Sequence, residues 1–137
     1  MNTSFPSDTP SYFADAESSL NDARFVLYGV PYEQTVTFRK GTKQGPLQIR
    51  QASWNFESFN PYTAIDLQDI HIHDYGNLAS IEQLSSEEMI QRVKTFTKTI
   101  VNQHKIPIVL GGEHSISAGV IKGFPTDSCV IVFDAHA

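Results

Sequence analysis

The chain has 137 residues, 40% hydrophobic and 18% charged, which is typical of one globular domain with an ordinary core. A formal net charge of -5 and the lack of any run of Lys or Arg argue against a nucleic-acid partner. The longest apolar runs are of strand length, which argues against a membrane span.

Residues 1–23 are expected to form an amino-terminal arm in front of a body that spans 24–137. The arm is rich in Ser, Asp, Asn and Pro, with Tyr12, Phe13 and Leu20 as apolar anchors, so we expect it to pack loosely. It lacks the basic start and apolar core of a signal peptide, which favours a cytoplasmic location.

The body opens with a strand, a loop and a helix. Residues 24–30 are rich in β-formers and predict a strand that is buried on both faces. The polar stretch 33–45 is too long for a simple turn, and loops of this kind often shape a site. Pro46 suits the first turn of a helix, which we place at about 46–57, before Pro61.

Residues 69–76 alternate apolar and polar side chains. This pattern predicts a strand with one solvated face, at an edge of the sheet. His71 and His73 are metal-ligand types, but the alternation already explains them as outward-facing polar positions, and we prefer that interpretation.

The second half of the body alternates helices and strands. Ser85 and Glu88 form a capping box, and apolar residues at helical spacing from Met89 to Val101 predict an amphipathic helix of about five turns. A strand ending at Leu110, a short helix over 115–122 and a strand over 129–133 follow. This order predicts right-handed crossovers and a parallel sheet covered on both faces.

Cys129 lies inside the predicted strand 129–133. We expect its thiol to be buried and not to bind a metal ion. As the lone cysteine it cannot form an internal disulfide, which favours a reducing compartment.

Two polar clusters follow the predicted strands that end at Leu110 and Phe133. His114 lies in the first cluster, and Asp134 and His136 lie in the second, beyond the carboxyl ends of buried parallel strands. Residues two apart on an extended segment point to the same side, so these three side chains can converge. Imidazole and carboxylate ligands suit Mn²⁺, with Zn²⁺ or Fe²⁺ possible.

Each of these residues also has a purely structural interpretation. His114 could cap its helix, Asp134 could cap whatever follows, and His136 could be an ordinary loop residue. The glycine pair before Glu113 could instead cradle an anion, although it lacks the spacing of a phosphate loop. Taken jointly, the residues favour a metal site.

The two clusters resemble the first two metal motifs of the ureohydrolase family, the arginases and agmatinases. Gly111-Gly112-Glu113-His114-Ser115 is similar to the pattern Gly-Gly-(Asp or Glu)-His-Ser, and Asp134-Ala135-His136-Ala137 is similar to the start of Asp-Ala-His-x-Asp. Gly29-Val30-Pro31-Tyr32, Gly41, Gly45-Pro46 and Ile49-Arg50 resemble the agmatinase-type segment, so the resemblance runs from Phe25 to the end of the chain.

The resemblance implies an arginase-like, three-layer α/β/α fold with a mainly parallel sheet and a binuclear Mn²⁺ centre. Within that centre His114 would bind one ion, Asp134 would bridge both and His136 would bind the other, with Glu113 as a support and Ser115 starting the helix. Water activated by the metals would attack a guanidino substrate and release urea, as in the hydrolysis of agmatine to putrescine in polyamine biosynthesis. Family members form trimers or hexamers, which implies a homo-oligomer at full length.

The chain also departs from the family pattern. It lacks the aspartate that would follow Ala137, and the later Asp-x-Asp segment and downstream proton-transfer histidine of the family. We therefore expect an amino-terminal part of one domain, truncated after the second metal motif and inactive in isolation. The alternatives are a relative acting on guanidinobutyrate or formiminoglutamate, or a non-catalytic module that acts with a partner chain.

Overall fold

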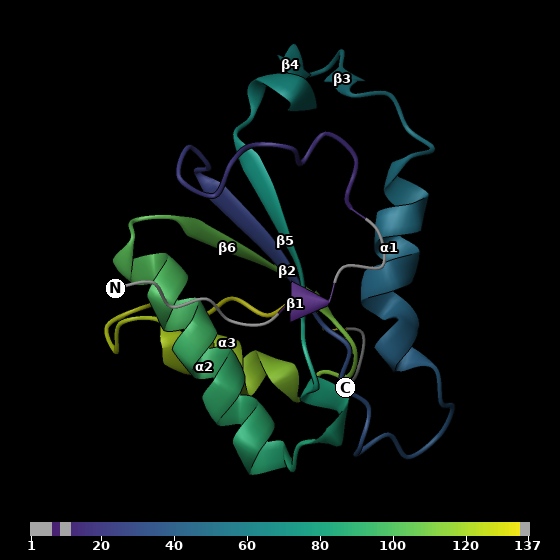
Figure 1. The fold of residues 1–137 in the computed structure, drawn as a ribbon, viewed down its shortest axis with the longest axis vertical. Coiled ribbons are helices and arrows are strands. Elements are labelled where there is room, and N and C mark those ends of the chain that lie inside the picture. Colours follow the sequence, from purple (N-terminus) through teal and green to yellow (C-terminus); the bar gives the residue numbers. More distant parts are fainter. Residues whose placement is uncertain (1–6, 9–11, 135–137) are drawn as a thin grey trace.

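The computed structural model describes residues 7–8 and 12–134. A central sheet lies between α1 on one face and α2 with α3 on the other (Figure 1). The elements in chain order are β1 (Ser7–Asp8), β2 (Phe25–Val30), η1 (Thr42–Gln44), α1 (Gly45–Ser53), β3 (Phe59–Asn60), β4 (Ile65–Asp66), η2 (Leu67–Asp69), β5 (Ile72–Leu78), η3 (Ile81–Gln83), α2 (Ser86–Asn102), β6 (Ile106–Gly111) and α3 (Ile116–Gly123).

The main sheet has the strand order β1-β5-β2-β6. β2 pairs in parallel with both β5 and β6, and only the two-residue β1 runs antiparallel. The carboxyl ends of β2, β5 and β6 therefore meet at one edge of the sheet. This arrangement confirms the predicted three-layer α/β/α fold with a mainly parallel sheet.

The main core lies between the sheet and α2. Tyr28 of β2 is fully buried and packs edge-on against Phe96 of α2, with ring centroids 4.8 Å apart. Its hydroxyl lies 2.7 Å from the Thr97 hydroxyl, so the buried phenol has a hydrogen-bond partner. Leu27 points to the opposite face of β2 and is also buried, which confirms a strand covered on both sides.

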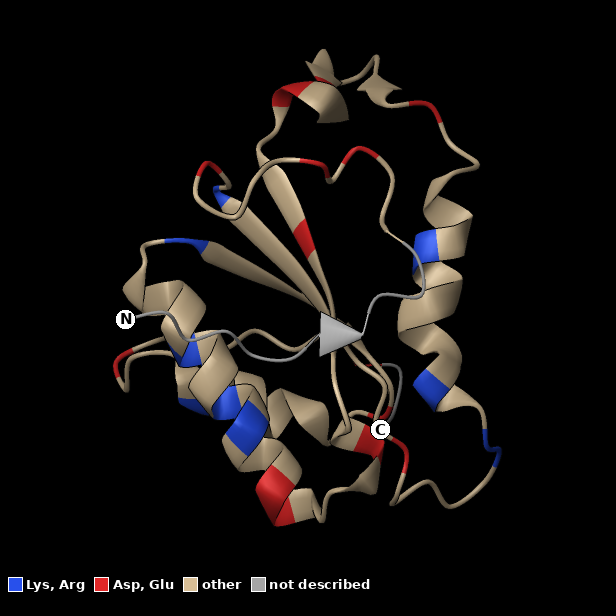
Figure 2. Ribbon diagram, viewed as in Figure 1, with Lys and Arg blue, Asp and Glu red and all other residues tan. Residues whose placement is uncertain are grey.

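The start of α2 agrees with the sequence prediction. The Ser85 side chain accepts a hydrogen bond from the Glu88 amide, and the Glu88 carboxylate accepts one from the Ser85 amide. The buried residues of α2 recur at helical spacing, while its basic residues lie away from the core (Figure 2). Local sequence alone is sufficient for this element because both capping partners lie within one turn.

The predicted helix 46–57 ends earlier, at Ser53. The Ser53 hydroxyl donates to the Arg50 carbonyl and accepts from the Ala14 amide, while the Trp54 indole N–H donates to the Tyr12 carbonyl. The contacts with Ala14 and Tyr12 tie the end of the helix to a distant segment of the chain.

The strand predicted at 69–76 lies at Ile72–Leu78, and two predictions about it are wrong. It is not the edge strand, because β1 and an isolated bridge from Glu17 to His73 cover its outer side. Its polar face is not fully solvated either, since Asp74 is only 3% exposed. Unpaired backbone groups at a sheet edge favour such a cover.

The amino-terminal arm supplies that cover, so the expectation of loose packing is wrong for its described part. The Ser18 amide donates to the Ile72 carbonyl, and the Asp74 amide donates to the Ala16 carbonyl. Ala14, Ala16 and Ala23 are buried. Small side chains let the arm approach the sheet closely.

The strand predicted over 129–133 is absent from the structure. Ile131 is 76% exposed and Phe133 is 97% exposed, and the segment does not pair with β6, the strand at the end of the sheet order. A strand needs a partner for its backbone hydrogen bonds, so the apolar sequence alone does not produce one. Cys129 is consequently exposed, which corrects the expectation of a buried thiol.

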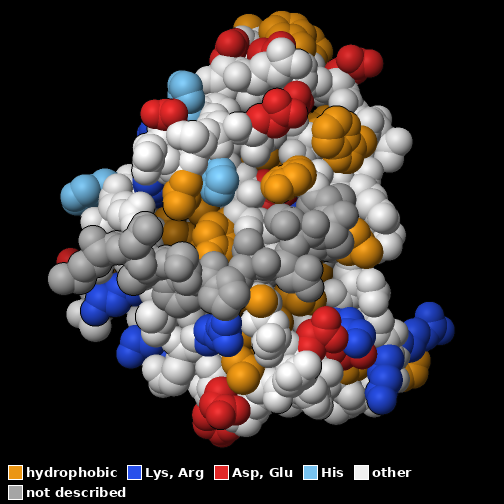
Figure 3. All heavy atoms as spheres, in the orientation of Figure 1, with side chains coloured by type: hydrophobic (Ala, Val, Ile, Leu, Met, Phe, Trp, Pro, Cys, Tyr) orange, Lys and Arg blue, Asp and Glu red, His pale blue; other side chains and the backbone are white. Residues whose placement is uncertain are grey.

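The far end of the molecule, formed by β3 and β4, also exposes hydrophobic side chains (Figure 3). Phe59, Tyr62 and Ile65 are 51%, 98% and 47% exposed. Within the described residues, none of the helices combines the length and the apolar character needed to cross a membrane.

Candidate metal centre

The turn after β6 carries the first predicted motif and crosses the carboxyl end of β2. The Gly112 amide donates to the Val30 carbonyl at 3.0 Å, and the Glu113 amide donates to the Tyr32 carbonyl at 2.9 Å. A Cβ at Gly112 would lie 2.2 Å from the Tyr32 carbonyl oxygen, closer than any side chain can approach. Glycine at this position therefore lets the turn lie directly on β2, which fixes the start of the motif.

Glu113 ties this turn to the loop that follows β2. Its carboxylate accepts hydrogen bonds from the amides of Gln34 and Thr35, both at 2.8 Å, and from the hydroxyls of Thr35 and Ser115. Burial by itself raises the pKa of Glu113, but these hydrogen bonds outweigh it and lower the pKa below its ordinary value. Glu113 is thus a buried, ionised anchor.

Ser115 is the N-cap residue of α3, as expected, but its side chain makes no capping bond to the helix. Instead its hydroxyl donates to Glu113. The serine therefore stabilises the turn through the carboxylate and leaves the adjacent His114 imidazole outside this network.

His114 and Asp134 lie side by side. The His114 Nδ1 atom is 3.4 Å from the Asp134 Oδ2 atom, and the two side chains are 65% and 32% exposed. The structure thus brings together two of the three predicted ligands, although they are 20 positions apart in the sequence. The third, His136, lies outside the described residues.

The donor types at this point fit a divalent transition metal. Imidazole nitrogen and carboxylate oxygen are ligands that Mn²⁺ accepts, and both side chains are partly open to solvent. Residues 7–8 and 12–134 contain no group of three or more His, Cys, Asp or Glu side chains placed to hold a metal ion. His114 and Asp134 are therefore two members of a candidate site that needs more ligands.

A cavity of about 480 Å³ adjoins His114. The turn Gly111–His114 and α3 form one side of it, and the exposed apolar residues 130–133 form the other. The segment that carries Asp134 is therefore separated from β6 by open space, not packed into the sheet.

The loop 33–45 contacts this site, as its composition suggested. Besides the bonds of Gln34 and Thr35 to Glu113, the Gln34 side-chain amide donates to the Glu82 carbonyl. Lys43 forms an ion pair with Glu82 at 2.8 Å. Gln34 and Thr35 were not predicted as part of the site, because no sequence signal connects them to a residue almost 80 positions away.

His71 and His73 do not join the candidate site. His71 is exposed, and the His73 Nδ1 atom lies 2.8 Å from the Ser18 carbonyl oxygen. The ring of His73 thus contacts the amino-terminal arm.

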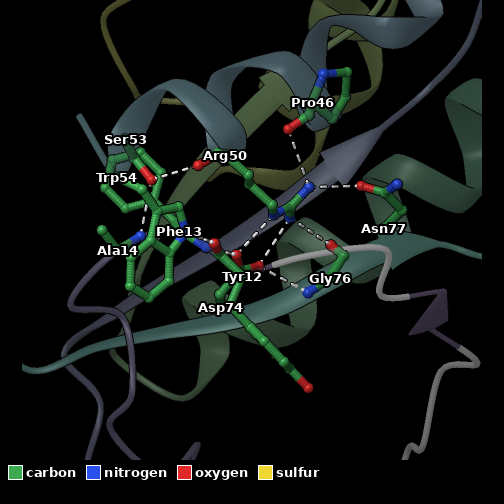
Figure 4. Close-up of polar contacts among 10 residues, drawn as sticks. All are labelled: Tyr12, Phe13, Ala14, Pro46, Arg50, Ser53, Trp54, Asp74, Gly76 and Asn77. Carbon is green, nitrogen blue, oxygen red and sulfur yellow. Dashed lines mark hydrogen bonds and ion pairs between the residues drawn. The ribbon is translucent and has the colours of Figure 1, made fainter.

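A second polar cluster, centred on Arg50 of α1, was not recognised from the sequence. Arg50 is fully buried and donates to both carboxylate oxygens of Asp74, at 2.7 and 2.8 Å (Figure 4). It also donates to the Asn77 side chain and to the carbonyls of Gly76 and Pro46, so all five guanidinium N–H groups have acceptors. The cluster joins α1 to β5 on the face opposite α2.

Residues 23–137 match the arginase family. The chain belongs to the arginase family. Its sequence is 32% identical over 128 residues to an agmatinase from Bacillus subtilis. It is 36% identical over 117 residues to an N(1)-aminopropylagmatine ureohydrolase from Thermococcus kodakarensis. These alignments cover 90% and 83% of this chain, and 43% and 40% of the relatives.

Solved structures agree with this membership. The agmatine ureohydrolase of Thermoplasma volcanium is similar with a TM-score of 0.80 and 35% identity, covering 85% of this chain and 39% of that one. A formiminoglutamase variant from Trypanosoma cruzi, crystallised with Mn²⁺, shares the fold with a TM-score of 0.69 and 24% identity, covering 82% of this chain and 39% of that one. The fold of this arginase-family chain is thus related to that of a protein that holds manganese.

The chain spans about 40% of the length of these relatives. The assignment of His114, Asp134 and His136 as ligands, and of Glu113 as their support, stays a prediction.

Proposed function

We propose that this arginase-family protein is a ureohydrolase that cleaves a guanidino substrate at a Mn²⁺ centre. His114, Asp134 and His136 would bind the metal, and agmatine is the first candidate substrate. The observation that carries the proposal is the 3.4 Å approach of the His114 and Asp134 side chains beyond the carboxyl end of β6. Relatives named as agmatinase and aminopropylagmatine ureohydrolase support the substrate class.

Bound manganese would supply Lewis-acid assistance to hydrolysis and a lowered pKa for water. Glu113 does not supply a general base in this proposal, because its carboxylate already accepts four hydrogen bonds, which lower its pKa and make it a weak base. Its role is to hold the turn that presents His114. The loop residues Gln34 and Thr35 close one side of the site by the same contacts.

Two manganese ions prefer about six donor atoms each. Three protein ligands are too few for this, even if one carboxylate bridges both ions and water molecules fill other positions. The proposal therefore requires ligands in addition to His114, Asp134 and His136. We expect the 137-residue chain alone to bind Mn²⁺ weakly and to release little or no urea.

Metal binding tests the ligand assignment separately from catalysis. We expect electron paramagnetic resonance titration to show weak Mn²⁺ binding to the purified chain, and His114→Ala or Asp134→Asn to weaken it at least tenfold. His71→Ala is the matched control, because His71 is exposed and outside the candidate site. Equal Mn²⁺ binding by all four proteins would contradict the assignment.

The assay for catalytic activity should use the protein in the form in which it occurs in its source. The form isolated from its source, with any polypeptide that accompanies it, should be assayed for urea release from agmatine, N1-aminopropylagmatine and 4-guanidinobutyrate, and for formamide release from formiminoglutamate. We expect urea release that chelation abolishes and Mn²⁺ restores, with agmatine turned over best. Lack of product from every substrate in the presence of Mn²⁺ would overturn the proposed function.

A further inference from the structure

A polar cavity of about 610 Å³ lies at the carboxyl ends of β2 and β5, away from the cavity beside His114. Its polar lining comes from η1, from the end of β5 and from η3: Lys43, Gln44, Asn77, Ser80, Glu82 and Gln83. The connection after β2 leads to α1 on one face of the sheet, and the connection after β5 leads to α2 on the other (Figure 1). Ligands commonly bind where connections diverge in this way.

Asn77 is the buried polar group of this cavity, and its orientation is fixed. A guanidinium group only donates hydrogen bonds, so the Asn77 atom that lies 2.8 Å from Arg50 Nη1 must be the carbonyl oxygen. The side-chain amide nitrogen therefore lies on the other side, away from Arg50 (Figure 4). Asn77 is only 8% exposed.

The backbone around Asn77 is adapted to this placement. The pairing of β5 with β2 shifts register between Leu27 and Gly29, and Gly76 has a positive φ of 85°. This irregularity lets Asp74 and Asn77, three positions apart, both face Arg50, which regular alternation along a strand forbids. A Cβ at Gly29 would lie 1.9 Å from the Asn77 carbonyl oxygen, so only glycine leaves room for that oxygen.

Across the part of the chain that the structure describes, the Asn77 amide nitrogen donates no hydrogen bond. Leaving such a buried donor unsatisfied costs about 1–3 kcal/mol. A hydrogen-bond acceptor inside the cavity would remove that cost.

The charges around the cavity indicate the kind of acceptor. Lys43 has three N–H donors, and its contact with Glu82 uses one of them. The Lys43 ammonium shares its charge with Glu82, and the Glu33 carboxylate accepts a hydrogen bond from the Lys43 backbone amide, so Lys43 would recognise a ligand through its remaining N–H donors. The start of α1, with Gln44 as an N-cap that makes no side-chain capping bond, adds the positive end of a helix dipole.

We propose that this cavity binds the carboxylate of a small organic acid, with Asn77 as the neutral donor and the remaining N–H groups of Lys43 as charged donors. The site is distinct from the candidate metal centre and requires no metal. It would hold one carboxylate group with a short chain attached, which a volume of about 610 Å³ accommodates.

Acetate in metal-free buffer is the probe. We expect titration of the ¹⁵N-labelled chain to shift the Asn77 side-chain amide resonances saturably, while equal concentrations of acetamide or chloride do not. Asn77→Asp keeps an oxygen toward Arg50 but replaces the donor with an anionic oxygen, so acetate binding should weaken at least tenfold.

Lys43→Gln provides a second test in case the buried Asn77→Asp variant does not fold. Lys43 is an exposed side chain, so its replacement should leave the fold intact and still weaken acetate binding about fivefold or more. Lys40→Gln is the matched control: it removes the same charge from the same loop at a residue outside the cavity lining, and it should bind acetate as the parent chain does.

Three results would overturn the proposal: no saturable shift at Asn77, equal effects of acetate and acetamide, or equal loss of binding in Lys43→Gln and Lys40→Gln. A crystal structure grown in acetate with only an ordered water on the Asn77 amide would also overturn it. None of these outcomes bears on Mn²⁺ binding by His114 and Asp134, so this inference and the proposed function can fail independently.

Discussion

At the scale of single residues, the fold buries an ion pair between Arg50 and Asp74. Arg50 and Asp74 are both almost inaccessible to solvent, yet every polar atom of the pair has a partner. The Phe13 amide also donates to Asp74, at 2.8 Å, so the amino-terminal arm depends on the same carboxylate. A pair of this kind contributes little net stability while intact, but losing one member leaves the other charged and desolvated.

We therefore expect Arg50→Leu to lower the free energy of unfolding by about 3–5 kcal/mol. The free energy of unfolding should fall less in the double variant Arg50→Leu/Asp74→Leu than in this single variant, because no uncompensated charge stays buried. Urea denaturation followed by circular dichroism measures both. Arg39→Leu, at an exposed position, is the control and should change stability by less than about 0.5 kcal/mol. A double variant less stable than Arg50→Leu would contradict the explanation.

Glu113 permits a test that depends on pH. Its carboxylate anchors two backbone amides and two hydroxyls, so Glu113→Gln should cost about 1–3 kcal/mol at neutral pH. Its pKa is lower in the folded chain than in the unfolded chain, so its stabilisation is present above the unfolded pKa and is lost as pH falls through the folded pKa.

The stability gap between the parent chain and Glu113→Gln should therefore narrow as the pH drops below the ordinary carboxyl range. Denaturation curves recorded from neutral to acidic pH measure this gap. Glu57→Gln, at an exposed carboxylate, should show no comparable gap. A gap that stays constant with pH would mean that the loss in Glu113→Gln comes from packing and not from charge.

At the scale of elements, α2 and β5 show two ways in which local structure is stabilised. The capping box of α2 lies within residues 85–88, so sequence alone identifies it. β5 instead acquires the hydrogen-bond partners on its outer side from the amino-terminal arm, more than fifty positions earlier. Nothing near β5 in the sequence signals that cover.

Removal of the cap should destabilise α2 without altering the sheet. We expect Ser85→Ala to lower the free energy of unfolding by about 1 kcal/mol, because the Glu88 amide loses its acceptor. Thr95→Ala on the exposed face of α2 is the control and should leave stability unchanged or slightly raised, since alanine is the better helix former. Thermal unfolding compares the two, and equal losses would contradict the role of the cap.

At the scale of the whole molecule, the segment 129–133 is an exposed apolar surface. Its side chains suit a buried strand, but they face solvent and border two cavities, of about 740 and 480 Å³. Exposed apolar residues favour association with other chains, as does the edge of β6, which pairs with no strand on its outer side among the described residues.

We expect the purified chain to self-associate with rising concentration, and Ile131→Lys/Phe133→Lys to reduce that association. The added charges repel like surfaces and replace two of the most exposed apolar side chains. Phe38→Lys is the control, because Phe38 is 85% exposed but lies outside this segment. Sedimentation velocity gives the distribution of species, and an unchanged distribution in the double variant would show that another surface is responsible.

The sequence by itself determined the features that depend on neighbours along the chain. The strand Phe25–Val30, the capped helix Ser86–Asn102 and the glycine turn before His114 follow from residues only a few positions apart. It also placed His114 and Asp134 at the ends of consecutive apolar runs, and the structure brings them within 3.4 Å.

The tertiary structure decided what depends on distant partners. Burial of Asp74, the orientation of the Asn77 amide and the hydrogen bonds from Gln34 and Thr35 to Glu113 each require residues from another element. The apolar run 130–133 is unpaired among the described residues and forms no strand. The type of a side chain indicates whether it prefers to be buried. The hydrogen-bond partners that buried polar groups need are supplied only by the packed chain.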